Sequence, residues 1–452
     1  MIEIDFSGLK KEARRVGFFG VGVSTLALIK RVPKDIKITL RSENKIDRAS
    51  LPTGVDIDKI YEGDSSFSDI SEDVLFLSPS VRRDRRELIP AVEGGVILSS
   101  DFEYFLTVND KPLFLISGSD GKSTAVTMLS ELLSNENEQI SPIGNVGRPF
   151  CDALEGTVWA HAAEVSSFQL LYSCPRSYRA ALTSVTPNHL NWHTSLDEYV
   201  NTKLSLLEKS SAPVASLDRG IIENFAKGRE LFGVTDSERT FEELKKQFKA
   251  QIYITLERGM ICKNGEGLIS SNDILRREPY NIKNLMTAIA VADGHTSNER
   301  ILRLARSFRG LSHRCERFFS KDGVNFIDSS IDTTPARTAT TLSSLEGNVI
   351  VILGGLGKGV PYDELCEPLK RCSKEIIITG ANRYEILCAV NTCATCYIAE
   401  NLKEATALAC SHAKSGDTVI LSPASTSYDA FSNYQIRGDF FKKEVENFYK
   451  QS

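Results

Sequence analysis

Short apolar runs rich in β-branched residues recur along the chain, and segments with the 3.6-residue periodicity of helices separate them. Several of these runs end in Gly, Ser or Pro. Uninterrupted apolar runs of this length are typical of strands covered on both faces, and their alternation with helices predicts an α/β fold with parallel sheets. The predicted strands are 16–19, 36–40, 74–77, 96–98, 113–116, 181–185, 349–353, 376–379 and 419–421.

Two interruptions of this pattern divide the chain. The first lies near 107–111, where the sequence V-N-D-K-P breaks the alternation, and the second lies near 309–312. A chain of 452 residues is also long enough for several domains, at roughly 150 residues each. We therefore predict three domains, at 1–108, 109–310 and 311–452.

The composition narrows the class of protein. Hydrophobic residues make up 41% of the chain and charged residues 25%, which excludes a disordered or collagen-like protein. The formal net charge of −5 argues against a surface devoted to nucleic acid. No apolar run approaches the roughly 20 residues of a membrane span, and residues 1–15 lack the apolar segment of a signal peptide. We expect a cytoplasmic protein without a membrane span.

The ten cysteines fit a reducing compartment, because their spacing shows no disulfide framework. Cys393 and Cys396 form a C-A-T-C motif, but no second pair of Cys or His residues follows to complete a zinc site. We expect a structural role for both thiols.

Residues 117–124 carry the strongest chemical signal. They read S-G-S-D-G-K-S-T, directly after a predicted strand and before a helical stretch at 125–133. A strand, a glycine loop and a helix N-terminus hold a triphosphate, because backbone N–H groups and the helix dipole face the anion. Lys122 supplies a positive charge, and Ser123 can reach Mg²⁺. The loop is shorter than the general Walker pattern, since Ile116 stands where the first glycine is expected.

A second glycine turn, with Gly20 and Gly22, follows the first predicted strand. Thr25 takes the place of the third glycine of a dinucleotide fingerprint, and no acidic residue ends the second strand. This pattern argues against a nicotinamide cofactor. It leaves two interpretations open: a tight turn without a ligand, or a site for a different phosphate-bearing ligand.

A series of motifs follows the phosphate loop, and their joint order is far more specific than any one of them. The motifs are G-S-D-G-K-S-T at 118–124, G-N-V-G at 144–147, E-V-S-S-F-Q-L at 164–170, N-H-L-N-W-H at 188–193, Lys203, N-I-K-N at 281–284, H-R-C-E-R at 313–317, G-G-L-G-K at 354–358 and L-S-P-A-S-T-S-Y-D-A-F at 421–431. In this order the chain resembles the Mur ligases, ATP-dependent amide-forming enzymes of peptidoglycan synthesis, over essentially its whole length.

The resemblance implies a fold and a reaction. It implies a Rossmann-like N-terminal domain, a P-loop ATPase-type central domain and a Rossmann-like C-terminal domain. Within the family, the pattern is most similar to members that join D-glutamate to UDP-N-acetylmuramoyl-L-alanine through an acyl phosphate. These partners are small molecules, and we expect a monomer without nucleic acid or membrane partners. Because the reactants are anionic, the site needs Mg²⁺ and cationic side chains to bring them together.

The resemblance also implies a metal site. Two Mg²⁺ ions are expected between Ser123, Glu164, His189 and Lys203. An ammonium group cannot ligate Mg²⁺, but a neutral amine can add CO₂ and become a carboxylate-like oxygen donor. We therefore predict that Lys203 is carbamylated, as the family position is.

The remaining roles are carried over position by position. The catalytic residues implied are Lys122, His189, Lys203, Arg314 and Lys358. The nucleotide-binding residues implied are Gly118, Ser119, Asp120, Gly121, Lys122, Ser123, Thr124, Asn281, Asn284, Arg314 and Asp328. The substrate-binding residues implied are Gly20, Gly22, Ser24, Arg41, Asn145, Ser166, Gln169, Thr333, Lys358, Ser427, Tyr428 and Tyr434.

Three departures from the family pattern concern substrate recognition. Residues 328–334 read D-S-S-I-D-T-T where the best-known members carry N-D-S-K-A-T-N, so Ile331 stands in the place of a lysine. Either Asp328 or Asp332 could contact the ATP ribose there. In addition, Leu40 and Arg41 stand where the family usually has an acidic residue and a residue with a hydroxyl group. Finally, Asn191 replaces an aspartate.

Three other functions stay open at this point. The first is another ligase of the same superfamily, such as a diaminopimelate- or lysine-adding enzyme or folylpolyglutamate synthase. The second is a non-catalytic nucleotide-binding regulatory or scaffold protein with a decayed ligase site. The third is a P-loop kinase, which leaves the motifs at 354–358 and 421–431 unexplained.

Overall fold

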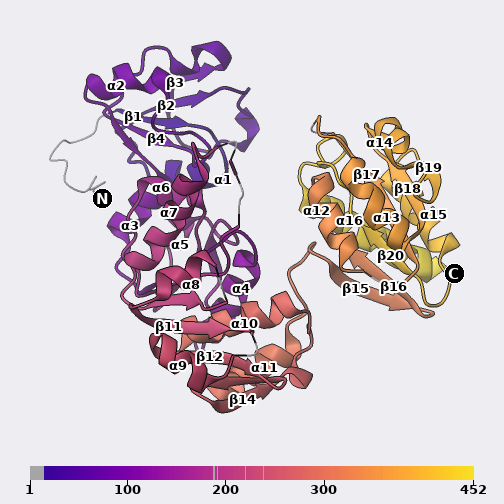
Figure 1. Cartoon of the computed structure of the whole chain (residues 1–452). Helices are drawn as coiled ribbons and strands as arrows, with labels where there is room; N and C mark the ends of the chain where they lie inside the picture. Colours follow the sequence, from indigo (N-terminus) through magenta and orange to yellow (C-terminus); the bar gives the residue numbers. More distant parts are fainter. Residues whose placement is uncertain are drawn as a thin grey trace. The chain divides into compact units, whose positions relative to one another are not determined.

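A computed structural model of the chain describes residues 15–451, apart from Pro187, Asn188, Asn191, Arg219, Glu238, Glu346 and Lys358. The chain divides into two compact units, Met1–Phe308 and Arg309–Ser452. The first unit contains two sheets and the second contains one (Figure 1). The prediction that no signal peptide is present concerns residues 1–14, which lie outside the described part. The three predicted domain ranges stay a prediction.

The first sheet is parallel, with the strand order β3-β2-β1-β4-β5. Its strands are β1 Arg15–Phe19, β2 Lys37–Ser42, β3 Ile57–Glu62, β4 Val74–Leu77 and β5 Ile97–Ser99, and its helices are α1 Val23–Ile29, α2 Ile89–Glu93 and α3 Asp101–Val108. Phe18 and Phe76 belong to the apolar cluster that includes α1 and α3, whereas Leu75 and Leu77 belong to the cluster that includes α2. Helices therefore cover both faces, as the uninterrupted apolar runs predict.

From β1, the strands β2 and β3 are added on one side and the strands β4 and β5 on the other. The strand order therefore reverses between β1 and β4, which lie side by side. In open parallel sheets, ligands bind outside the carboxyl ends of the strands at such a switch point. Gly20 follows β1 and Ser78 follows β4, so the glycine turn lies at this position. The main-chain N–H of Ser78 donates to the carbonyl of Phe19 at 2.8 Å.

The second sheet has the order β14-β13-β12-β11-β10-β9-β6-β8-β7 and is parallel from β12 to β7. Its strands are β6 Leu113–Ser117, β7 Pro142–Gly144, β8 His161–Glu164, β9 Arg179–Leu182, β10 Pro213–Ser216, β11 Glu230–Thr235, β12 Lys249–Glu257, β13 Met260–Lys263 and β14 Glu266–Ser270. The helices of this part are α4 Lys122–Leu133, α5 Phe150–Ala153, α6 Ser167–Tyr172, α7 Leu196–Glu208, α8 Ile221–Ala226, α9 Phe241–Gln247, α10 Pro279–Ala292 and α11 Asn298–Ser307.

Strand β9 ends three residues before the predicted strand 181–185 does. The reason is Thr183, whose hydroxyl donates to the carbonyl of Ser117 at 3.3 Å and also to the carbonyl of Asp120. The chain therefore leaves the sheet at Thr183 to support the loop that follows β6.

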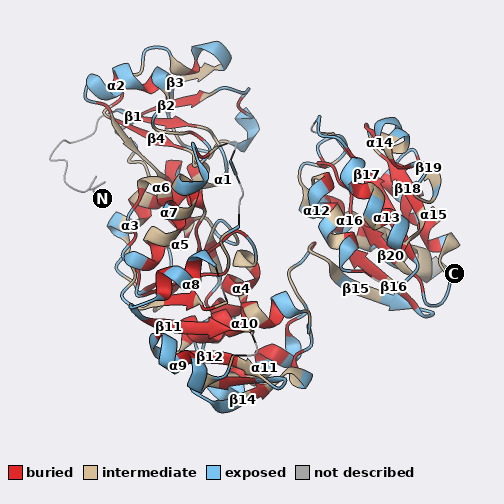
Figure 2. Ribbon diagram, viewed as in Figure 1, coloured by how far each residue is buried: buried red, intermediate tan, exposed pale blue. Residues whose placement is uncertain are grey.

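The third sheet, in the second unit, has the order β15-β16-β20-β17-β18-β19 and is parallel except for β15. Its strands are β15 Glu316–Lys321, β16 Val324–Asp328, β17 Val349–Gly354, β18 Ser373–Thr379, β19 Thr395–Ile398 and β20 Thr418–Leu421, and its helices are α12 Pro335–Ser343, α13 Cys366–Cys372, α14 Arg383–Val390, α15 Leu402–His412 and α16 Tyr434–Gln451. Its central strands are buried and its helices expose their outer sides (Figure 2). Short 3₁₀ turns lie at Arg48–Ser50, Gly63–Phe67, Arg86–Leu88, Ser271–Asp273 and Asp363–Leu365.

None of the helices in the described part combines the length and the apolar character that crossing a bilayer requires. All ten cysteines are free thiols. Cys396 donates to the carbonyl of Ala394 at 3.4 Å, and Cys393 packs against the apolar core of the second unit. These contacts agree with the structural role predicted for the C-A-T-C pair.

Arg41 is one of the largest fully buried side chains of the chain, at 1% exposure. Its Nε donates to Glu72 Oε1 at 2.8 Å, and its terminal nitrogens donate to the carbonyls of Ser66, Ser68 and Asp69 at 3.1, 2.7 and 2.9 Å. The guanidinium group is thus committed to holding the chain between β3 and β4. We therefore assign the guanidinium group a structural role, and the prediction that Arg41 binds the substrate stays a prediction.

We expect Arg41→Met to lower the free energy of unfolding by about 3–5 kcal/mol, because it leaves the Glu72 carboxylate buried without its cation. Urea-induced unfolding measures this loss. Arg48→Met is the matched control, since Arg48 is 51% exposed and pairs with Glu62 at 3.2 Å. Such surface pairs contribute less than about 1 kcal/mol. An equal loss in both variants would contradict the structural role.

Candidate active site

The loop between β6 and α4 has the geometry of a phosphate-binding loop. Gly118 and Gly121 have φ angles of +149° and +79°, which residues with side chains rarely adopt. A Cβ atom at Gly118 would lie 2.0 Å from Thr183 Oγ1 and 3.0 Å from the main-chain nitrogen of Ser184. A glycine is therefore required at 118 both by the backbone conformation and by the space around it.

The rest of the loop is held from behind by the segment after β9. The N–H of Ser119 donates to the carbonyl of Ser184 at 2.9 Å, and the N–H of Asp120 donates to the Ser184 hydroxyl at 3.0 Å. The Ser119 hydroxyl lies 2.7 Å from the hydroxyl of Tyr199 on α7. These two N–H groups are engaged within the chain, so the loop leaves the N–H groups in the first turn of α4, where Lys122, Ser123 and Thr124 lie, to face an anion.

Two lysine side chains converge on one carbonyl oxygen. Lys122 Nζ and Lys203 Nζ lie 2.9 and 2.8 Å from the oxygen of Gly118. Lys203 comes from α7 and is only 2% exposed. Burial, and then the charge of Lys122, lower the pKa of the Lys203 ammonium to about 7. A large fraction of Lys203 is therefore a neutral amine near neutral pH.

Oxygen donors lie next to the loop at the end of β8. Ser123 Oγ donates to Glu164 Oε2 at 2.7 Å, and Asn145 Nδ2 donates to Glu164 Oε1 at 3.2 Å. Glu164 is 2% exposed, at the carboxyl end of a strand beside β6. Three residues that the sequence predicts for metal or substrate binding thus meet in one hydrogen-bonded group.

His189 is the third predicted metal ligand. Its chain neighbours Pro187, Asn188 and Asn191 lie outside the described residues. Its ring lies 5.0 Å from the ring of Phe168, edge to face. Partial burial, and then the charges of Lys122 and Lys203, lower the pKa of His189. The imidazole is therefore held in the neutral form that can ligate a metal.

Helix α10 carries two buried asparagines, of which Asn284 reaches the phosphate loop. Asn284 lies against Gly121, where a Cβ atom would be 2.3 Å from Asn284 Oδ1. Asn281 donates from Nδ2 to Glu278 Oε2 at 3.0 Å. Both side chains are 5% exposed. Their position beside α4 agrees with a place near a nucleotide bound to this loop.

Ser166 and Gln169 form a capping box at the start of α6. Ser166 Oγ accepts from the N–H of Gln169 at 3.3 Å, and Gln169 Oε1 accepts from the N–H of Ser166 at 2.9 Å. Their first role is therefore to start the helix that follows Glu164. Ser24 lies in α1, directly after Gly20 and Gly22.

The second unit assembles its own group of predicted residues. His313 Nδ1 lies 2.6 Å from Asp328 Oδ2, and Asp328 also accepts from the N–H of Ser330 at 2.8 Å. The ring of Tyr434 packs edge to face on His313, with centroids 6.2 Å apart. Asp328 is fully buried, so in this conformation its carboxylate holds His313 rather than facing a ribose.

The glycine loop before Lys358 lies beside the segment that contains Ser427. Leu356 and Thr426 exchange main-chain hydrogen bonds of 2.9 and 3.0 Å. Lys358 itself lies outside the described residues. Ser427 is buried and Tyr428 is 68% exposed. Of the other predicted residues of this unit, Arg314 directly follows His313 and Thr333 lies five residues after Asp328 in the chain.

Arg437 on α16 is a residue of this group that no sequence motif predicts. Its Nε donates to Ser330 Oγ at 2.9 Å, and its terminal nitrogens donate to the carbonyls of Ser330 and Ser425 at 2.8 and 3.0 Å. Burial lowers its pKa to about 10. Arg437 therefore ties the 328–334 segment to the 421–431 motif. A single arginine in an amphipathic helix gives no sequence signal of such a contact.

Comparison with known proteins agrees with this geometry. Residues 116–292 match the Mur ligase middle domain, and residues 313–425 match the Mur ligase glutamate ligase domain. The UDP-N-acetylmuramoylalanine–D-glutamate ligase of Ruminiclostridium cellulolyticum is 32% identical over 463 residues, covering 96% of this chain and 97% of that protein. The chain belongs to the Mur ligase family. The ligase of the same description from Clostridium botulinum is 31% identical, with 96% of each chain covered.

Solved structures of other Mur ligases share the fold. The UDP-N-acetylmuramate–alanine ligase MurC of Thermotoga maritima has a TM-score of 0.60 at 16% identity, covering 98% of this chain and 100% of that chain. A pseudomurein peptide ligase type C from Methanothermus fervidus has a TM-score of 0.52, also at 16% identity, with coverage of 97% and 100%. These similarities show that this Mur ligase has the mixed α/β fold with three sheets.

We expect Gly118→Ala to weaken nucleotide binding by tenfold or more, roughly the effect of losing about 1.4 kcal/mol. The added methyl group would displace Thr183 and Ser184, which hold the loop. Binding of Mg·ATP by calorimetry measures the effect. Gly220→Ala is the matched control, because Gly220 has a φ angle of +121° but open space around its Cβ position. Normal nucleotide binding by Gly118→Ala would contradict the loop assignment.

Proposed function

We propose that this Mur ligase uses ATP to join D-glutamate to UDP-N-acetylmuramoyl-L-alanine in peptidoglycan synthesis. ATP would phosphorylate the substrate carboxylate, and the amine of D-glutamate would attack the acyl phosphate and expel phosphate. The proposal is supported by relatives of that description, which match nearly the whole chain. A monomeric state and a cytoplasmic location stay predictions.

The observation that carries the proposal is the meeting of Lys122 and Lys203 at Gly118, with Glu164 and Ser123 beside them. Such a site combines the positive charge of Lys122, a buried amine and oxygen donors at one loop. Transfer of phosphate between two anions needs this combination, because like charges must be brought together. Lys122 would hold the β- and γ-phosphates, with Asn281 and Asn284 beside the base.

The residues present fit Mg²⁺. The Glu164 carboxylate and the Ser123 hydroxyl are hard oxygen donors, and they already lie 2.7 Å apart. The lowered pKa of His189 keeps its ring nitrogen available as a ligand. When bound, the ions would neutralise charge on the phosphates and the substrate carboxylate. Ser123 and Glu164 would hold one ion, and His189 and a modified Lys203 would hold the other.

The environment of Lys203 supports its carbamylation. Only the neutral amine can add CO₂, and the pKa of about 7 makes that form abundant. The product would be an anion, which the nearby Lys122 charge would stabilise. Modification would therefore turn a destabilised buried cation into an oxygen donor beside Glu164.

In the second unit, we propose that Ser427, Tyr434 and Thr333 receive D-glutamate, with Lys358 pairing with one of its carboxylates. Arg314 would contact phosphate through its planar guanidinium group. Asp328 supports this role indirectly, since it fixes His313 beside Arg314.

We expect the purified protein to release phosphate from ATP only when both UDP-N-acetylmuramoyl-L-alanine and D-glutamate are present. A phosphate assay, with the ligated product identified by mass, measures this. Parallel reactions contain L-glutamate, L-lysine or diaminopimelate in place of D-glutamate.

Each alternative function gives a distinct result in the same experiment. Turnover with another amino acid instead of D-glutamate indicates a different ligase of the superfamily. ATP binding without any substrate-dependent phosphate release indicates a non-catalytic protein, and phosphate transfer without an amide product indicates a kinase.

We expect Lys203→Ala to lower the activity by more than about 100-fold. Even the loss of a residue that only hydrogen-bonds to a metal ligand typically lowers activity by roughly 10–100-fold. Short carboxylic acids should partly restore activity, because they can replace the carbamate oxygens. Steady-state kinetics with and without acetate or formate measure this. Lys209→Ala is the matched control, since Lys209 is exposed at the end of the same helix. Full activity of Lys203→Ala would eliminate the carbamate.

A further inference from the structure

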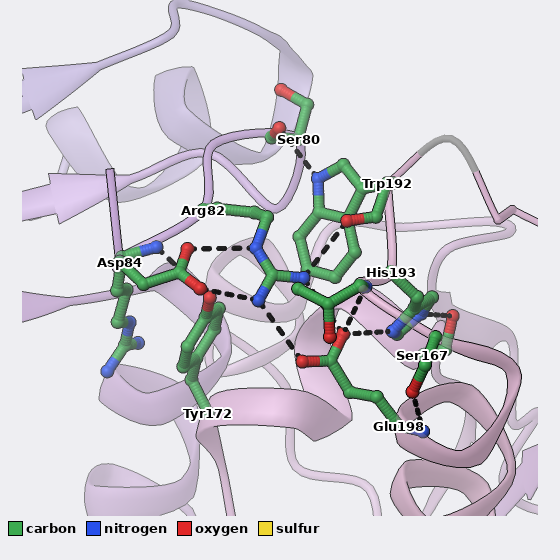
Figure 3. A network of polar contacts seen from close by, with 11 residues as sticks. Ser80, Arg82, Asp84, Ser167, Tyr172, Trp192, His193 and Glu198 are labelled. Atoms are coloured by element: carbon green, nitrogen blue, oxygen red, sulfur yellow. Dashed lines mark hydrogen bonds and ion pairs between the residues drawn. The ribbon is translucent and has the colours of Figure 1, made fainter. Parts of the chain in front are cut away.

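Arg82 lies at the centre of a polar network between the two sheets of the first unit (Figure 3). It belongs to the loop 78–83, which follows β4. Its Nη1 and Nη2 donate to the two carboxylate oxygens of Glu198 on α7, at 2.9 and 3.2 Å. Nη1 also donates to the carbonyl of Trp192 at 3.0 Å, and Nε and Nη2 donate to the two carboxylate oxygens of Asp84 at 2.8 and 2.6 Å. Three segments of the chain are thus held by one guanidinium group.

The first residue of the loop 78–83, Ser78, contacts the glycine turn that follows β1. Ser78 lies so close to Gly20 that a Cβ atom there would be 2.7 Å from Ser78 Cβ. The hydroxyls of Ser78 and Ser80 lie 3.2 Å apart, and the indole N–H of Trp192 donates to the carbonyl of Ser80 at 2.9 Å. A ligand at the switch point beside Gly20 would therefore contact the same loop that holds Trp192.

Glu198 extends the network to the segment that carries His189. Its Oε2 accepts from the N–H of Thr194 at 3.0 Å and lies 3.1 Å from His193 Nδ1. His193 is buried, and its other ring nitrogen lies 3.0 Å from the hydroxyl of Ser167.

The last step reaches His189 itself. The N–H groups of Trp192 and His193 both donate to the carbonyl of His189 at 3.0 Å. Phe168, which follows Ser167, stacks on Trp192 at 4.3 Å and meets the His189 ring at 5.0 Å. The position of His189 is thus fixed by contacts that end at Glu198 and Arg82.

We propose that Arg82 is a positioning residue that couples occupancy of the Gly20 turn by the nucleotide-sugar acid to the placement of His189 at the Mg·ATP site. This inference rests on the proposed function. The residues between the two sites form one continuous chain of contacts, from Ser78 through Ser80, Trp192 and Arg82 to His189. Binding at either end would then favour binding at the other, since coupling between sites is reciprocal.

The ion pair between Arg82 and Glu198 is partly shielded from solvent. Arg82 and Glu198 are 16% and 22% exposed, so water screens their attraction only partly. The hydrogen bond from Arg82, foremost, lowers the pKa of Glu198 to about 2, so the carboxylate stays charged at any physiological pH. The bidentate geometry also fixes the angle between the loop and α7, which a single contact would not do.

The test is a binding measurement with Arg82→Met. The affinity of a non-hydrolysable ATP analogue with Mg²⁺ is measured by calorimetry, alone and with saturating UDP-N-acetylmuramoyl-L-alanine. In the wild type, we expect the acid to tighten analogue binding about tenfold, within the 5–150-fold range of coupled sites. In Arg82→Met, we expect this factor to fall to near one.

Arg83→Met is the matched control. Arg83 is 18% exposed and, from the same loop, forms an ion pair with Glu103 on α3 rather than with α7. Arg83→Met should keep the wild-type coupling factor. Arg82→Lys, which keeps the charge but loses the two-pronged contact, should give an intermediate factor. Adding Glu198→Gln to Arg82→Met should cause no further loss, because both changes break the same contact.

The outcomes separate the inference from the proposed function. Coupling that persists in Arg82→Met, or that disappears equally in Arg83→Met, would overturn the positioning role. A wild type that binds both ligands without any coupling would overturn it too, while leaving the ligase proposal intact. A wild type that does not bind the nucleotide-sugar acid would instead refute the proposed function, together with the inference that rests on it.

Discussion

Two lysine side chains share one carbonyl oxygen in this protein, and the chemistry of the site depends on that arrangement. Lys122 and Lys203 both end at Gly118, with only a main-chain dipole between them. A buried cation next to another cation is unstable, so Lys203 gives up its proton readily. The site is therefore arranged to receive negative charge, either from phosphate at the loop or from a modification of the amine.

Much of the fold could be predicted from the sequence, because each signal came from neighbours along the chain. Uninterrupted apolar runs predicted the buried strands, and S-G-S-D-G-K-S-T predicted the loop before α4. The end of β9 was misplaced because the contacts of Thr183 with Ser117 and Asp120 come from a distant segment. Local periodicity shows that a strand exists better than it shows where the strand stops.

Side-chain roles were harder to predict, because they depend on contacts between distant parts of the chain. Arg82 and Glu198 are separated by 116 residues, and neither belongs to a motif. The resemblance identified Lys203, yet only the structure shows that it is buried against Gly118. Arg437 likewise became visible only when α16 was placed against the segment 328–334.

The buried guanidinium group of Arg41 has a consequence for the glycine turn nearby. Only the main chain of Arg41 reaches that turn, where its carbonyl accepts from the N–H of Gly20 at 2.8 Å. A ligand at the turn would thus meet the main chain of Arg41 and not its guanidinium group. The charge of Arg41 therefore acts on this turn only indirectly, by fixing the course of β2 against the segment before β4.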